Sequence, residues 1–265
     1  MANGLLWAAV GTGFTFLMTA MGAGTVFFFR KSISTCAQRV FLGFAAGVMV
    51  AASIWSLIVP AIEEAEAMGQ PVLLPAAGGF ALGVGFMLLM DALIPHLHLG
   101  ESHPEGLSTS WQRSTLLFSA VTLHNIPEGM AVGLTFALAT EHGGSGAFYA
   151  GALALALGMG IQNFPEGAAI SLPLRSGGMK APRAFAFGAL SGAVEPVFGI
   201  LVVLVAGVIQ PVMPWLLSFA AGSMMYVVVE ELIPEAHLGE HSHMGTLSVM
   251  AGFLVMMMLD VALGG

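Results

Sequence analysis

A six-residue motif occurs twice in this chain, each time inside an apolar stretch long enough to cross a lipid bilayer. The motif reads HNIPEG at residues 124–129 and QNFPEG at residues 162–167. A proline and an ionisable side chain are both costly inside a membrane, because neither can be satisfied by lipid. The chain therefore has to fold so that these groups face one another or water.

Each copy of the motif gathers its polar side chains on one helical face. Positions separated by three or four residues lie on the same side of a helix. The first copy therefore groups His124, Asn125 and Glu128, and the second copy groups Gln162, Asn163 and Glu166. Each group supplies half of a metal-binding cage.

The composition predicts an all-α integral membrane protein. Of the 265 residues, 57% are hydrophobic and only 8% are charged, and the mean hydropathy is +0.90. Soluble domains carry roughly 25% charged residues, so little of this chain can form an aqueous domain. The single cysteine, Cys36, excludes an internal disulfide and a cysteine-based structural zinc site.

Eight apolar stretches are close to the ~20 residues that a helix needs to cross the hydrocarbon core. They cover approximately residues 5–29, 41–60, 72–94, 116–139, 147–170, 185–209, 212–233 and 247–263. We interpret residues 1–265 as one transmembrane transporter domain, an eight-helix bundle. The first stretch has no basic residue before it, so we interpret it as a membrane helix and not as a cleaved signal peptide.

The basic residues predict the topology. All seven lie in the connections after the first, third and fifth stretches: Arg30, Lys31, Arg39, Arg113, Arg175, Lys180 and Arg183. Cytoplasmic loops are enriched in Lys and Arg, so these connections are expected on the cytoplasmic side. With eight crossings, both termini are then outside, and the protein is expected to be a multi-pass protein of the cell membrane.

Several sequence echoes predict inverted repeats. The fourth and fifth stretches run in opposite directions and carry the paired motif, so a two-fold axis in the membrane plane can relate them. A weaker echo, FAAG, occurs at residues 44–47 and 219–222. Glycines four residues apart, such as Gly43 and Gly47 or Gly129 and Gly133, predict close contact between helices.

Glu195, followed by a proline in the sixth stretch, is expected to be the third carboxylate of the site, although a protonated acid that packs helices is an alternative. Glu128, Glu166 and Glu195 would bring three negative charges into the membrane if all were ionised. One or two divalent cations reduce this charge to a magnitude of one, which is easier to bury. The ligand set lacks thiolate, so zinc, iron, manganese, cobalt and cadmium all fit it.

A longer echo relates residues 91–101 to residues 230–240 at two predicted cytoplasmic exits. Both segments combine acids with histidines, and solvated loops are the simplest alternative. We interpret them as weak capture sites for a departing divalent ion. The loop histidines assigned to this role are His103, His237, His241 and His243.

The paired HNIPEG and QNFPEG motifs, with a glutamate on the sixth stretch, resemble those of the ZIP (Zrt/Irt-like protein) divalent metal transporters, and the prokaryotic branch in particular. The resemblance covers nearly the whole chain. It implies a two-metal site. One ion would be held by His124, Glu128, Gln162 and Glu166, and its neighbour by Asn125, Asn163 and Glu195, with Glu128 and Glu166 bridging.

The same resemblance implies a path through the membrane. The exit would be formed by Asp91, His96, His98 and Glu231, with Glu230 beside them. Met49 resembles the outer entrance. Asn163 departs from relatives that carry aspartate at this position, so the second ion is expected to bind less tightly here.

The expected function is transport of a divalent metal, zinc first, into the cytoplasm. The metal is the transported substrate and no cofactor is expected. Two alternatives remain: a membrane-embedded zinc metallohydrolase, although the HExxH pattern is absent, and a proton-driven metal exporter. The expected partners are metal ions and lipid and not nucleic acid, and a homodimer is left open.

The glutamates of the two motifs are expected at different depths in the membrane. Counted from the ends of the apolar stretches, Glu166 lies nearer the cytoplasm than Glu128. If both bind the same ions, the fifth stretch has to continue past Ile170 toward Pro173, or be displaced relative to the fourth.

Overall fold

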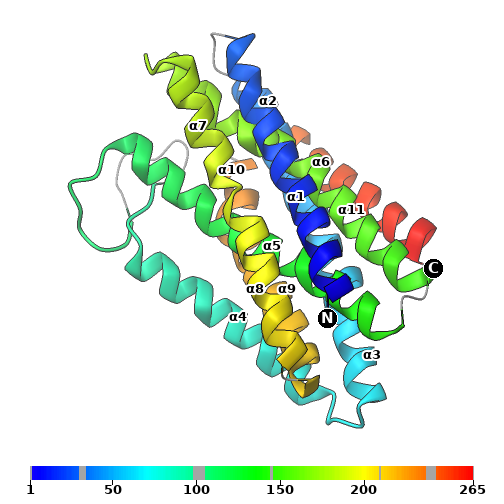
Figure 1. Ribbon diagram of the computed structural model, residues 1–265. Helices are drawn as coiled ribbons and strands as arrows, with labels where there is room; N and C mark the ends of the chain where they lie inside the picture. The colour runs from blue at the N-terminus through cyan, green and yellow to red at the C-terminus, as the bar shows by residue number, and fades with distance from the viewer. Residues whose placement is uncertain are drawn as a thin grey trace.

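The computed structural model describes residues 2–29, 34–97, 105–143, 146–208, 210–236 and 243–264. These residues form a bundle of long helices that run roughly along one common direction (Figure 1). Within the described ranges there is no β-strand, and the only β-bridge joins His96 to Glu105.

The first half of the chain contributes three membrane-length helical runs. Helix α1 spans Ala2–Gly24 and continues as a short 3-10 turn, η1, Thr25–Phe27. Helix α2, Thr35–Ala52, continues through a π-helical segment, η2, Ser53–Ile58, into α3, Val59–Ala67. Helix α4 spans Leu73–Leu93.

The second half contributes five further runs. Helices α5, Arg113–Glu141, and α6, Gly146–Ser176, carry the two motifs. Helices α7, Ala181–Ser191, and α8, Val194–Val208, form one interrupted run, and the 3-10 turn η3, Gln210–Val212, follows. Helix α9, Met213–Val227, continues through the π-helical η4, Val228–Leu232, into α10, Ile233–Ala236, and α11 spans His243–Gly264.

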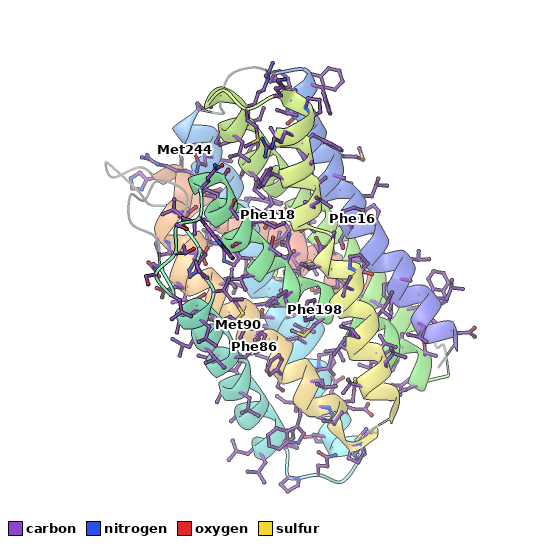
Figure 2. All side chains as sticks on the ribbon, turned by 60° about the vertical axis from the view of Figure 1, so that its left-hand side comes forward. Phe16, Phe86, Met90, Phe118, Phe198 and Met244 are labelled. Carbon is purple, nitrogen blue, oxygen red and sulfur yellow. The ribbon has the colours of Figure 1, made fainter. Side chains whose placement is uncertain are left out.

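The bundle is apolar on the surface that lipid would contact. Seven of the described runs, all except α5, are long and apolar enough to cross a membrane. Leucines on α4 are largely exposed, with Leu73 at 76% and Leu82 at 60%, and Phe86 and Met90 lie on the same helix (Figure 2). A large exposed apolar surface of this kind fits a bilayer and not water.

Helix α5 is less apolar because it lies inside the bundle. Every residue from Gly129 to Ala139 is buried. It contacts α1, α6, α8 and α9, so other helices and not lipid surround its polar motif. The arrangement explains how a polar helix is accommodated in this fold.

The two termini lie at the same end of the bundle (Figure 1). The turn between α3 and α4 lies at that end as well. The described basic residues, Arg39, Arg113, Arg175, Lys180 and Arg183, belong to the connections at the opposite end. The basic connections and the termini therefore lie at opposite ends of the bundle.

Glycines allow two helix pairs to approach closely in the same way. A Cβ atom on Gly47 of α2 would lie 2.0 Å from Val249 O of α11, and one on Gly222 of α9 would lie 2.1 Å from Phe80 O of α4. The reciprocal contacts are Gly252 on Phe44 and Gly83 on Phe219. The α2–α11 and α4–α9 pairs therefore use equivalent positions, including both FAAG echoes.

Three of the helical boundaries differ from the sequence expectation. Helix α6 runs to Ser176, past Ile170, which is the extension that the depth mismatch called for. The α2–α3 run ends at Ala67 and not near residue 60, so Glu63, Glu64 and Glu66 are helical and not in a loop. The sixth stretch is broken at Gly192 and Ala193, directly before Glu195.

The two π-helical segments each precede a proline. Pro60 and Pro234 follow η2 and η4 as the second residue of the next helix. Proline has no N–H group and its ring crowds the carbonyl four residues earlier, so the helix widens there. The wider turn η4 contains Glu231 and orients it toward the interior.

Candidate metal centre and transport path

The two motifs meet in the interior of the bundle on α5 and α6. Both helices continue through their internal prolines, Pro127 and Pro165. The polar side chains of the motifs are buried, with exposed fractions of 8% or less, except for Glu166, which is half-buried and lines an inner cavity. The buried residues are His124, Asn125, Glu128, Gln162 and Asn163.

Carboxamides of α6 bind carboxylates of the neighbouring helices. Gln162 Nε2 donates to Glu128 Oε1 at 2.6 Å. Asn163 Nδ2 lies 3.0 Å from both oxygens of Glu195. Each amide therefore links α6 to another helix. Its N–H group donates to a carboxylate oxygen, which is the kind of atom that a bound cation would also contact.

Oxygen atoms without hydrogen-bond partners collect at the same place. Among the described residues, buried polar atoms lacking a partner include Asn125 Oδ1 and Nδ2, Glu128 Oε2, Gln162 Oε1, Asn163 Oδ1 and Glu166 Oε2. A buried polar atom without a partner is unfavourable by ~1 to 3 kcal/mol. Such a concentration of unsatisfied oxygens is what a site for a hard or borderline cation requires.

Glu195 reaches the centre because its helix is interrupted. Pro196 cannot donate to Gly192 O, and Glu195 N donates to that oxygen at 3.1 Å instead. Glu195 thereby falls in the first turn of α8, where the helix dipole favours a negative charge. Its side chain is fully buried.

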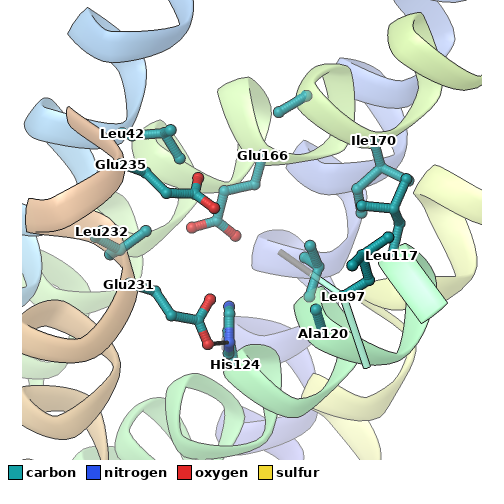
Figure 3. A pocket seen from close by; sticks show the side chains of 12 residues that line it. Leu42, Leu97, Leu117, Ala120, His124, Glu166, Ile170, Glu231, Leu232 and Glu235 are labelled. Atoms are coloured by element: carbon teal, nitrogen blue, oxygen red, sulfur yellow. Dashed lines mark hydrogen bonds and ion pairs between the residues drawn. The ribbon is translucent and has the colours of Figure 1, made fainter. Parts of the chain in front are cut away.

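The side chain of His124 contacts a residue of the expected exit. Its Nε2 atom contacts Glu231 Oε1 of η4. The pair lines an inner cavity of about 40 Å³, into which Glu166 and Glu235 also extend (Figure 3). A cavity of this size holds a few waters or one partly hydrated ion.

The expected exit residues lie near this cavity to different degrees. His96 is buried; its Nδ1 bonds Ile94 O at 2.8 Å, and its Nε2 lies 3.9 Å from Asp91 Oδ1. Tyr226 of α9 lies near Asp91. Glu230 is exposed on the outside of η4 and does not line the cavity.

Most of the loop histidines cannot be placed. His98, His103, His237 and His241 lie outside the described residues. His243 is exposed and is the first residue of α11. It therefore sits at the helical end of the loop and not within it.

A second cavity opens near the end of the bundle that carries the termini. It has a volume of about 400 Å³ and is lined by Ser56, Glu63 and Asp260, among other residues. Ser56 Oγ donates to Asp260 Oδ1 at 2.8 Å. Met49, expected at the entrance, is fully buried in the core and does not line this cavity.

The described residues do not contain a group of three or more His, Cys, Asp or Glu side chains close enough to hold a metal. The central cluster combines carboxylates with carboxamides, and its histidine points to Glu231. Ligation by the expected set therefore requires His124 to turn toward Glu128 and the amides to present their oxygen atoms.

Several functional neighbours were missed in the sequence. Thr15 and Thr19 of α1 face Glu195, and Thr19 Oγ1 lies 3.4 Å from Glu195 Oε1. The spacing of Thr12, Thr15 and Thr19 on one face of an apolar helix is the signal that identifies them. Glu235, within the segment 230–240, and Tyr226, just before it, were not singled out from the sequence.

The fold and the centre define a multi-pass membrane transport protein with a buried polar site. A family model described as the ZIP Zinc transporter matches residues 98–260. The chain is 38% identical to the "Zinc transporter ZIP11" of Homo sapiens, over 97% of each chain. It is 36% identical to the "Zinc transporter GufA" of Myxococcus xanthus, over 93% of this chain and 95% of the other.

A third relative is the "Zinc transporter ZIPB" of Bordetella bronchiseptica. It is 38% identical, over 97% of this chain and 82% of the other. The chain belongs to the ZIP zinc transporter family. The resemblance of the paired motifs is thereby confirmed, and the protein is a transporter and not a metallohydrolase.

Proposed function

We propose that this protein carries zinc, and related divalent ions such as iron, manganese, cobalt and cadmium, across the cell membrane into the cytoplasm. The ion binds between α5, α6 and α8. His124, Glu128, Gln162 and Glu166 hold the first position, and Asn125, Asn163 and Glu195 hold the second. The observation that carries this proposal is the collection of unsatisfied buried oxygens at the centre.

The contact between His124 and Glu231 supports a path from the centre to the inner cavity. His124 belongs to the motif, whereas Glu231 belongs to the expected exit. A histidine that alternates between Glu128 and Glu231 passes an ion from the centre toward the cavity. Asp91 and His96 then continue the path, and His98 and the loop histidines would complete it.

Position along the bundle supports the direction of entry. The outer cavity with Asp260 lies toward the end with the termini, and the inner cavity lies toward the end with the basic loops. Basic loops are typical of the cytoplasmic side. With α5 as the eighth crossing, both termini face outside.

The test is zinc uptake by purified protein in proteoliposomes. Glu128→Ala removes a central carboxylate and should reduce uptake to the level of empty vesicles, while the melting temperature shows whether the variant is folded. Glu66→Ala, an exposed acid at the end of α3, is the matched control and should transport normally. Normal uptake by a folded Glu128→Ala protein would refute the proposed site.

A further inference from the structure

We propose that Thr19 of α1 is a positioning residue for Glu195, so that α1 contributes to the second metal position. This inference rests on the proposed function, because it concerns how one ligand of that site is held. None of the site residues expected from the sequence belongs to α1.

The first observation is a polar stripe in an otherwise apolar helix. Thr12, Thr15 and Thr19 are all fully buried. Thr19 Oγ1 lies 3.4 Å from Glu195 Oε1, whereas the Thr15 hydroxyl donates to Thr12 O at 3.0 Å. Glu195 therefore has two side-chain donors from different helices, Thr19 of α1 and Asn163 of α6.

The Thr19 hydroxyl has two acceptors for one hydrogen. Thr15 O lies 3.3 Å away, which is as close as the carboxylate. The hydroxyl can therefore donate to Glu195 Oε1 by rotation alone, and it can hold that oxygen while an ion occupies Oε2. Rotation of a hydroxyl needs no movement of the helix.

The second observation is that Thr19 supports the break that places Glu195. A Cβ atom on Gly192, between α7 and α8, would lie 2.9 Å from Thr19 Cβ. The threonine side chain thus packs directly against the interrupted backbone three residues before Glu195. It contacts both the carboxylate and the turn that orients it.

The third observation comes from equivalent helix contacts. A Cβ atom on Gly129 would lie 2.4 Å from Glu195 O, and one on Gly167 would lie 2.0 Å from Thr19 O. Gly129 and Gly167 end the two motif copies, so Thr19 occupies beside α6 the place that Glu195 occupies beside α5. One half of the centre supplies an acid and the other half a hydroxyl.

The two sides of the centre therefore differ in their chemistry. The acid side can ligate an ion directly, whereas the hydroxyl side orients the acid. Thr19→Val keeps the shape of the side chain and removes the hydroxyl. We expect zinc to bind the position at Glu195 about fivefold more weakly, with the other position unchanged.

The experiment measures zinc binding by calorimetry and ion occupancy by anomalous diffraction in one set of purified variants. Thr19→Ser keeps the hydroxyl and should bind as the unchanged protein does. Thr12→Val is the matched control, because the Thr12 hydroxyl donates only to Ala8 O, at 2.6 Å. Thr19→Ala, which opens space where valine fills it, should show the same loss as Thr19→Val.

The outcomes separate this inference from the proposed function. Glu195→Gln should lose the second position, and adding Thr19→Val to it should cause no further loss. Normal zinc binding by the Thr19→Val protein would overturn the role of the hydroxyl. A loss of zinc binding in Thr19→Val that is absent from Thr19→Ala would overturn it as well. Normal binding by Glu195→Gln would instead overturn the second metal position itself.

Discussion

At the scale of residues, the centre is built from acids whose partners are amides and hydroxyls. Gln162 and Asn163 donate to Glu128 and Glu195, and their own oxygens face the interior without partners. An amide that donates to a buried carboxylate offsets part of the cost of burying its charge. The two amides therefore stabilise Glu128 and Glu195 in the interior of the bundle.

In the proposed site, Asn163 is expected to limit the affinity of the second metal position. Asn163→Asp replaces a neutral amide with a carboxylate next to Glu195, and a further anionic ligand should tighten zinc binding there by about tenfold. Calorimetry of the purified variant measures the affinity and the number of bound ions. The conservative control Asn163→Gln keeps the amide, and an Asn163→Asp protein with unchanged stoichiometry and affinity would contradict this assignment.

At the level of residues, the sequence identifies the polar side chains whose burial in a membrane costs the most free energy. Asn125, Glu128 and Glu195 stand out because polar groups are rare in apolar stretches, and the structure buries all three. Thr19 could not be identified in this way. A threonine in a membrane helix can donate its hydroxyl to a carbonyl of its own helix, so its burial costs little free energy. The rotation of His124 toward Glu231 depends on a neighbouring helix and has no signature in the sequence.

At the scale of elements, close packing around glycine holds the motif helices in place. Gly167 at the end of the second motif lies against the backbone of α1, and Gly22 of α1 lies against Phe164 O. Helices in lipid associate through such packing, because hydrophobicity does not distinguish a helix from lipid. The depth of Glu166 relative to α1 is thus fixed by close contacts at glycine.

Gly167→Ala should destabilise the bundle. The added methyl group would lie 2.0 Å from Thr19 O, a backbone atom that cannot move alone. Overpacking of this kind costs about 1 to 3 kcal/mol, and we expect a melting temperature lower by several degrees. Gly151→Ala on the same helix is the control, because no atom lies within 4 Å of its Cβ position. Equal melting temperatures for the two variants would contradict the packing argument.

The boundaries of elements were harder to predict than their existence. Hydropathy identified the apolar stretches, but the α2–α3 run continues through Glu63 and Glu64 because Glu64 is buried and bonds His142 at 2.7 Å. The break before Glu195 follows from Pro196, which the sequence shows but does not place within a helix. Interactions between helices decide both cases.

At the scale of the whole molecule, the topology assigns opposite sides to the two ends of the bundle. The only cysteine, Cys36, is exposed at the start of α2, at the end with the basic loops. A membrane-impermeant thiol reagent should label Cys36 in intact cells only after permeabilisation. In a Cys36→Ser background, Glu66→Cys at the opposite end should be labelled without permeabilisation. The reverse pattern would invert the topology and the proposed direction.

The central claim is that the ion binds where α5, α6 and α8 meet. Anomalous diffraction from crystals grown with zinc measures the number of ions, their ligands and their positions in one experiment. We predict a peak between Glu128 and Glu166, with His124 turned toward it, and a weaker peak beside Asn163 and Glu195. Zinc density found only in the loops or at the outer cavity, with the centre unchanged, would contradict this account.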